Sequence, residues 1–299
     1  MKCKFISISM GILFSLMFFS CSTMGLVTDV LQISSMIAGT QDNKAVSSLL
    51  EAGATISKAA EPITPENEYY IGRSVAASIL SNYNIFESSE KELYLNRICR
   101  VITEKSSRPE LYNGYHVKIL DTDEINALTT SGGHIFVTKG LINCAKSEDS
   151  LAGVIAHEVA HIQLEHSIKA IKASRWTTAG TTSLNAAINI ASDNDAEKMD
   201  DIVGDIISSM INSGYSHSQE FDADKAALFL MNEAGYNPSS MIDFLEELKL
   251  KEKGSFSGFS KTHPSASSRI SKAKKELSKL TLSNDTSIFR VERFQETFR

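Results

Sequence analysis

One short segment, residues 157–161, carries the residue types of a metal-dependent hydrolase at helical spacing, with the sequence His-Glu-Val-Ala-His. Residues four apart share a face of a helix, so His157 and His161 can each offer a ring nitrogen to one zinc ion. Glu158 lies beside that pair and can take a proton from a zinc-bound water and pass it to a departing amine. The H-E-x-x-H pattern therefore predicts zinc-assisted hydrolysis of peptide bonds.

The alternative is a charged helix face whose two histidines are solvated or belong to the core. The neighbours of the motif argue against a solvated face, because Val154, Ile155 and Ile162 are apolar. Histidine and glutamate side chains in such buried surroundings need a partner, and a metal ion would supply one.

A tetrahedral catalytic zinc also needs a third protein ligand and an open position for water. The best candidate is Glu220, four residues before Asp224 and therefore on the same face of a predicted helix. Asp224 can accept a hydrogen bond from the far ring nitrogen of a zinc histidine, for which His157 is the favoured partner. An acidic surface turn is the alternative, but the alanines and leucines around the pair predict a largely buried helix. His166 falls about 140° around the helix from His161 and is not expected to bind the zinc.

Several helices and a small sheet are needed to bring these residues together. Alternating apolar residues predict strands, and apolar residues at helical spacing predict helices, with caps such as Thr64 before Pro65 and Gly235 after Ala234. The fold class is therefore α+β, predominantly α-helical, with one small β-sheet. The predicted strands are Tyr115–Asp121, Ile125–Leu128 and His134–Lys139, and the predicted helices are Pro65–Leu80, Ser89–Lys105, a long helix from about Glu148, Ser216–Ala234, Ser239–Lys253 and Pro264–Leu280.

The first twenty residues differ from the rest of the chain. Lys2 and Lys4 precede a short apolar run, which is typical of a secretion signal. Cys21 follows directly and resembles the lipid-acceptor cysteine of bacterial lipoproteins, although an uncleaved signal anchor with an incidental cysteine is the alternative. Either interpretation places the chain outside the cytoplasm. The predicted organisation is a lipoprotein signal (1–20), a membrane-proximal tether (21–60), a catalytic domain (61–280) and a C-terminal tail (281–299).

The charge of the chain bears on its binding partners, and its cysteines bear on whether a disulfide can form. The 299 residues carry a net charge of −6 with no long run of positive residues, which argues against nucleic acid as a partner. Cys99 and Cys144 remain after the signal and the lipid site, so they form a candidate disulfide in an exported protein, or else two buried thiols. Residues 176–214 are rich in small residues, and their role is not legible from the sequence.

The zinc motif followed by Glu220-x-x-x-Asp224 resembles the M48 family of gluzincin metallopeptidases, in particular its short periplasmic lipoprotein members related to the Ste24 and Oma1 proteases. The resemblance covers residues 61–275. It implies a zincin-like domain that binds one Zn²⁺ per chain and acts as a zinc metalloendopeptidase of the bacterial cell envelope. The other segments that carry the resemblance are Glu61–Glu66, Ile71-Gly72, Asn126-Ala127, Gly132–Leu141, Glu148-Asp149, Thr262–Ser265 and Arg269-Ile270.

The resemblance also implies roles outside the zinc motif. The strand that begins at Gly133 would be a sheet edge that pairs with an extended substrate. His263 would stabilise the oxyanion, fill the open zinc position or simply precede a helix. Arg269, grouped with the substrate-binding residues, would contact a carboxylate in the site or support the loop. The implied substrate-binding residues are Gly133, His134, Ile135, Phe136, Val137 and Arg269.

The implied substrates are misfolded or unassembled envelope proteins, met on the periplasmic side of a membrane together with envelope assembly partners. Two rival functions stay open. One is a binding protein of the same fold whose zinc site is plugged by His263, and the other is a structural lipoprotein with a relict motif. The complete ligand set disfavours the relict.

Overall fold

The computed structural model describes residues 59–177, 214–251, 263, 265–282 and 287–299, together with residues 53, 54, 56 and 57. The predicted signal, Cys21, most of the tether and most of residues 176–214 lie outside the described residues, so the predictions for them stay predictions. None of the helices in the described ranges is both long enough and apolar enough to cross a membrane.

The described part of the chain contains one sheet of three strands, β1 (His116–Leu120), β2 (Ala127–Thr129) and β3 (His134–Thr138), in the order β1-β3-β2. β1 pairs with β3 in parallel and β2 pairs with β3 antiparallel. Gly132 (φ 78°) and Gly133 (φ 97°) lie in the left-handed region and turn the chain between β2 and β3. The three predicted strands are confirmed, but the prediction that β3 is an edge is wrong, because the turn folds β2 against one side of β3 while β1 pairs with the other.

Helix α4 (Pro65–Leu80) covers one face of the sheet. As predicted, Thr64 caps it, and Thr64 Oγ1 accepts a hydrogen bond from the amide of Asn67 at 3.1 Å. Gly72 approaches the turn after β2 so closely that a β-carbon there would lie 1.5 Å from the carbonyl oxygen of Ser131. The absence of a side chain at Gly72 therefore seats α4 on the sheet. The side chains that pack between them are Val75, Ala76, Ile79, Leu120 and Phe136.

The opposite face of the sheet packs against α5 (Ser89–Thr103) and α7 (Glu148–Gln163). Strand alternation sends residues such as Val117 and Ile135 into this second core. The helix α7 begins where the acidic pair predicted it and is buried from Glu148 to Ile162. A helix buried on every face can hold polar side chains only where the surrounding elements supply partners for them.

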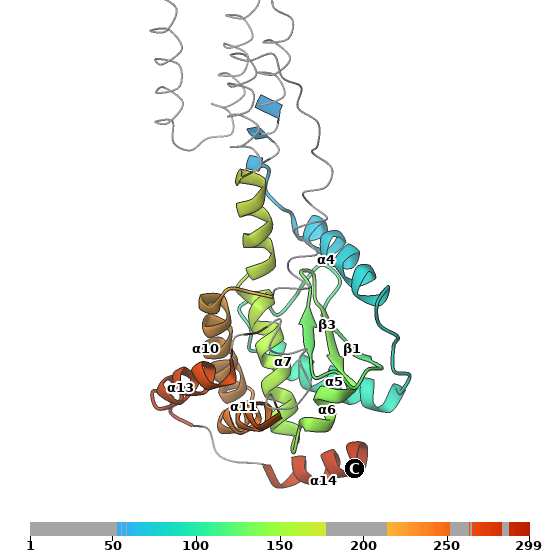
Figure 1. Cartoon of the computed structure of the whole chain (residues 1–299), viewed down its shortest axis with the longest axis vertical. Coiled ribbons are helices and arrows are strands. Elements are labelled where there is room, and N and C mark those ends of the chain that lie inside the picture. The colour runs from blue at the N-terminus through green and yellow to red at the C-terminus, as the bar shows by residue number, and fades with distance from the viewer. Residues whose placement is uncertain are drawn as a thin grey trace, which may run out of the picture. The chain divides into compact units, whose positions relative to one another are not determined.

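Three further helices surround α7. Helix α10 (His217–Glu233) runs beside it, and α11 (Ser239–Lys251) and α13 (Ala266–Leu277) pack next to them (Figure 1). Ser216 and Gln219 form a capping box at the start of α10. These helices confirm the predictions, with ends that differ by a few residues.

The helices near residues 140 and 290 were not predicted. The helix α6 (Lys139–Cys144) follows β3 directly and has only six residues, too few for helical periodicity to show in the sequence. The helix α14 (Ser287–Phe298) lies in the segment assigned to a C-terminal tail, yet it packs on α5 and α7 and buries Phe294 in the same core. The packed domain therefore extends beyond the predicted boundary at residue 280.

The candidate disulfide is absent. Cys99 and Cys144 are both free and buried, which confirms the alternative of two buried thiols. Cys99 belongs to the core of α5, where burial raises its pKa to about 12. Cys144 donates a hydrogen bond to the carbonyl oxygen of Gly140 within α6. Each thiol is thus accommodated by its own helix.

Candidate metal centre and active site

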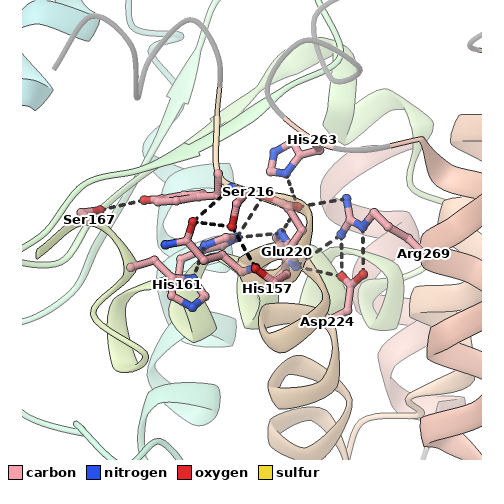
Figure 2. A network of polar contacts seen from close by, with 12 residues as sticks. His157, His161, Ser167, Ser216, Glu220, Asp224, His263 and Arg269 are labelled. Atoms are coloured by element: carbon pink, nitrogen blue, oxygen red, sulfur yellow. Dashed lines mark hydrogen bonds and ion pairs between the residues drawn. The ribbon is translucent and has the colours of Figure 1, made fainter. Parts of the chain in front are cut away.

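Helices α7 and α10 bring the three predicted zinc ligands together (Figure 2). The Nε2 atoms of His157 and His161 lie 3.1 Å apart. Glu220 reaches both of them, with Oε2 at 3.4 Å from His157 Nε2 and Oε1 at 3.5 Å from His161 Nε2. All three side chains are buried. The two histidines of α7 and the carboxylate of Glu220 on α10 thus meet at one point, as the sequence predicts.

His263 joins this group from the segment before α13. Its Nδ1 lies 2.8 Å from Glu220 Oε2, and its ring contacts that of His157 edge-on, with centroids 5.4 Å apart. One ligand atom from each of His157, His161, Glu220 and His263 falls within 4.8 Å of the other three. His263 therefore lies where a fourth ligand would lie.

The residues present fit a zinc ion. Three imidazoles and one carboxylate are among the ligand types that zinc prefers. Glu220 Oε1 is buried and has no hydrogen-bond partner within the described part of the chain. A buried carboxylate oxygen without a donor is costly unless a cation compensates it. Burial by itself raises the pKa of Glu220, but His263 and His157 hold that pKa well below its usual value, so Glu220 is the ionised ligand that a metal needs.

The carboxylate of Asp224 contacts His157 on the side of the ring away from the metal site, as predicted. Its Nδ1 lies 3.0 Å from Asp224 Oδ1, so Asp224 can fix the tautomer that leaves Nε2 for the metal. Burial and Arg269 alone would lower the pKa of His157, but Asp224 and Glu220 outweigh them and raise it to about 9 in the metal-free protein. A proton on His157 thus has to leave when a metal binds.

Arg269 lies behind Asp224 rather than in the open cleft. Its Nε and Nη2 donate to the two oxygens of Asp224 at 2.9 and 2.6 Å, and its side chain is only 2% exposed. This bidentate pair places Arg269 against a carboxylate of the site, which is one of the two roles predicted for it, and its grouping with the substrate-binding residues stays a prediction. Burial raises the pKa of Asp224, but Arg269 and His157 lower it to about 2, so the carboxylate stays ionised.

His161 has a different partner, His166, which no motif in the sequence indicated. His166 Nδ1 lies 2.9 Å from His161 Nδ1, on the side of the ring away from Glu220. His166 is not among the clustered ligands, as predicted, but helical geometry does not describe its position. The helix α7 ends at Gln163, and Glu165 adopts a left-handed conformation with φ 55°, which reorients the chain before His166. No periodic signal in the sequence reports such a turn.

Glu158 is buried beside the ligand cluster without belonging to it. Burial raises its pKa, as befits a carboxylate that must accept a proton near neutral pH. A largely apolar pocket opens from it between α4 and β2. The residues that line this pocket include Ile71 and Val75 of α4, residues 127–131, Glu158, Tyr215 and His263.

The strand along this pocket is β2, not the predicted β3. Residues 135–137 of β3 are buried and paired on both sides, so they cannot accept a further strand. The amide of Thr130 donates to the carbonyl oxygen of His134, and the amide of Thr138 donates to that of Asn126. Because an antiparallel ladder alternates, the backbone groups of residues 127 and 129 face away from β3. The open edge next to Glu158 is therefore that of β2.

The proteins that this chain resembles in sequence are metalloproteases, which agrees with the cluster of metal-binding residues. The profile of the family described as "Peptidase family M48" matches residues 89–277, more than half of the chain. The chain is 30% identical over 201 residues to the mitochondrial metalloendopeptidase OMA1 of Schizosaccharomyces pombe, which covers 65% of this chain and 56% of that protein. It is 26% identical over 235 residues to the metalloprotease YcaL of Escherichia coli, covering 77% of this chain and 86% of that protein.

A third relative is the beta-barrel assembly-enhancing protease of Escherichia coli, 25% identical over 233 residues. The match covers 75% of this chain and 45% of that protein. The chain thus spans about half the length of two of these three relatives and most of the length of the other. All three are named as proteases, and the matched region contains every residue of the metal centre described above.

Proposed function

This chain belongs to peptidase family M48 of zinc metallopeptidases, and from that premise we propose that it cleaves extended segments of cell-envelope proteins. The observation that carries the proposal is the convergence of His157, His161 and Glu220 at one point, with Glu158 beside them at the end of an open pocket. A bound zinc ion would supply a Lewis acid for the scissile carbonyl and a nucleophilic water at neutral pH.

Glu158 handles the protons in this proposal. Its carboxylate takes a proton from the attacking water and returns it to the nitrogen of the departing amine. Burial raises the pKa of Glu158, which strengthens its carboxylate as a base. Among the described residues, Glu158 is not one of the clustered ligands, so zinc binding would not occupy its carboxylate.

The open edge of β2 positions the substrate. An extended peptide that pairs antiparallel with residues 127 and 129 adds a fourth strand and brings its backbone next to Glu158. Main-chain pairing favours unfolded over folded substrates, because a folded protein has already used these backbone groups. The apolar side chains of Ile71 and Val75 face the same pocket and favour an apolar residue of the substrate.

Proline at two neighbouring positions tests this role of β2. Thr129→Pro removes an amide that faces outward, so the fold is retained and KM for an unfolded protein rises. Leu128→Pro removes an amide that pairs with β3, so it lowers the melting temperature instead. Equal KM values for Thr129→Pro and the parent would exclude pairing along β2.

An envelope location is supported by the predicted signal and by the name of one relative, the beta-barrel assembly-enhancing protease. A lipid on Cys21 would tether the enzyme to a membrane, and the relative named for beta-barrel assembly points to envelope assembly partners and misfolded envelope proteins as substrates. Mass spectrometry of the mature chain tests this directly. A diacylglyceryl group on Cys21 supports the proposal, and an unmodified cysteine within an intact leader argues for the uncleaved signal anchor.

The enzyme is distinguished from a plugged binding protein by two variants. Glu158→Gln is expected to retain zinc but to cleave unfolded casein about 10²–10⁴-fold more slowly, because the base is lost and the ligands remain. A variant that cleaves as fast as the parent would disprove the mechanism. If the parent is inactive and His263→Ala is active, then His263 plugs the site.

A further inference from the structure

The two zinc histidines are held by different partners, and only one of these partners follows the familiar carboxylate pattern. His157 has the oxygen of Asp224 behind it, whereas His161 has the ring nitrogen of His166. His166 is 4% exposed, so its contact with His161 is shielded from water. A buried contact of 2.9 Å between two ring nitrogens requires that one of them donates a proton and the other accepts it.

The chemistry of the site decides which nitrogen donates. His161 turns its Nε2 toward His157 and Glu220, so a metal in the cluster binds through Nε2. A neutral imidazole that binds a metal through one nitrogen carries its proton on the other, which here is Nδ1. His166 Nδ1 is then the acceptor, and the proton of the neutral His166 ring lies on its own Nε2.

Tyr215 completes the cradle around His161. Its ring stacks on that of His161, with centroids 4.1 Å apart and an interplanar angle of 18°. Its hydroxyl forms a hydrogen bond of 2.7 Å with the hydroxyl of Ser167, the residue after His166. Tyr215 directly precedes the capping residue of α10, so this bond ties the turn after α7 to the helix that carries Glu220. The stacked ring also prevents His161 from rotating about its side-chain bonds.

We propose that His166 is a positioning residue that holds His161 in its metal-binding tautomer and orientation, with Tyr215 as the second wall of the cradle. The proposal rests on the zinc site of the proposed function. It assigns His166 no contact with substrate and no place among the metal ligands. It predicts that the nitrogen of His166 can be replaced only by another acceptor at the same place.

Zinc affinity of the full chain tests this proposal through three variants. His166→Leu removes the acceptor and is expected to weaken zinc binding about 10–100-fold, the usual cost of losing the outer partner of a metal-bound histidine. His166→Asn puts an oxygen where Nδ1 was and is expected to bind zinc within about threefold of the parent. The matched control His217→Leu removes an exposed histidine and is expected to leave the affinity unchanged.

The affinities are measured by competition with a chromophoric chelator, alongside the melting temperatures of the metal-free proteins. Equal zinc affinity of His166→Leu and the parent would overturn the proposal, and so would an equal loss in His166→Asn and His166→Leu. Failure of the parent itself to bind zinc would overturn the proposed function as well, which separates the two failures.

A second measurement does not depend on the folding of any variant. Nitrogen-15 spectra of the zinc-loaded parent report which ring nitrogen of each histidine carries its proton. The expected result is a proton on Nδ1 of His161 and on Nε2 of His166. A proton on Nδ1 of His166 would overturn the proposal, because that nitrogen could not then accept from His161.

Discussion

The two ends of α7 both bury carboxylates beside arginines, yet they are built for different purposes. At its start, Glu148 and Asp149 face Arg293 and Arg290 of α14, an arrangement that we call the α14 clamp. At its other end, Glu158 faces the group of His157, His161, Glu220 and His263, backed by Asp224 and Arg269. Both the clamp and the metal centre include residues of α7, whose apolar side chains belong to the main hydrophobic core.

The two sites differ in how many of their carboxylate oxygens accept a hydrogen bond. Each oxygen of Glu148 accepts a hydrogen bond from Arg293 and from a tyrosine, Tyr94 or Tyr236. Both oxygens of Asp149 accept from Arg290. In the metal centre, by contrast, Glu220 Oε1 has no hydrogen-bond partner in the described ranges. A buried acid with every oxygen paired stabilises the fold, whereas one with an oxygen turned toward three imidazoles is prepared for a cation.

The largest effect on zinc affinity is expected from removing the negative charge of Glu220. Glu220→Gln should abolish tight zinc binding, a loss greater than the 10–100-fold typical of outer partners, because a direct ligand loses its charge. The metal-free variant should be less stable than the parent, because His263 and His157 stabilise the ionised form of Glu220 and a neutral amide loses that stabilisation. Chelator competition and thermal unfolding measure the two effects. Zinc binding at parental affinity would show that Glu220 is not a ligand.

Breaking the α14 clamp should lower the stability of the fold and leave zinc binding intact. Arg290→Ala leaves the buried carboxylate of Asp149 without its main partner, and the expected loss of stability is about 3–5 kcal/mol in chemical unfolding. Zinc affinity of the folded protein should not change, because the clamp lies at the far end of α7. The exposed pair Lys274–Glu246 offers a control, and Lys274→Ala should leave stability unchanged. A change of zinc affinity in Arg290→Ala would show that the two ends are coupled.

Zinc binding should release a proton from His157. His157 has its pKa raised to about 9 without metal, so at pH 7 it is protonated and must lose a proton to bind zinc. Below that pKa, zinc affinity should rise about tenfold for each unit of pH, because the competing proton becomes scarcer. Calorimetry in buffers of different ionisation enthalpy counts the released protons. An affinity that stays constant between pH 6 and pH 8 would contradict the protonated state of His157.

The smallest effect is expected within the clamp itself. Tyr236→Phe removes one hydrogen bond to Glu148 but leaves Arg293 and Tyr94 in place, so the expected loss of stability is about 1 kcal/mol. Comparison with Arg290→Ala in the same unfolding experiment then separates the loss of a single donor from the loss of a charge partner. Equal losses in the two variants would show that charge compensation does not govern the clamp.

Local patterns in the sequence were sufficient for much of this architecture. The caps at Thr64 and Gly235 and the apolar spacing of the long helices depend on neighbours within a few residues, and they predict the helices well. The spacing of His157 and His161, and of Glu220 and Asp224, is likewise a property of a single helix. These residues could therefore be named as a zinc site before any tertiary structure was known.

The tertiary structure decided what local patterns cannot contain. Strand alternation identifies β3 but not its neighbours, so its central place became clear only from the pairing of β1 and β2. The left-handed backbone of Glu165 brings His166 back to His161, and the packing of α14 on α7 turns a predicted tail into part of the core. The sequence likewise does not show that Arg269 is buried and paired with Asp224, 45 residues before it. Helix and strand propensities depend on residues near in sequence, whereas strand pairing, burial and charge compensation join residues far apart. These long-range contacts decided between the alternatives that the sequence left open.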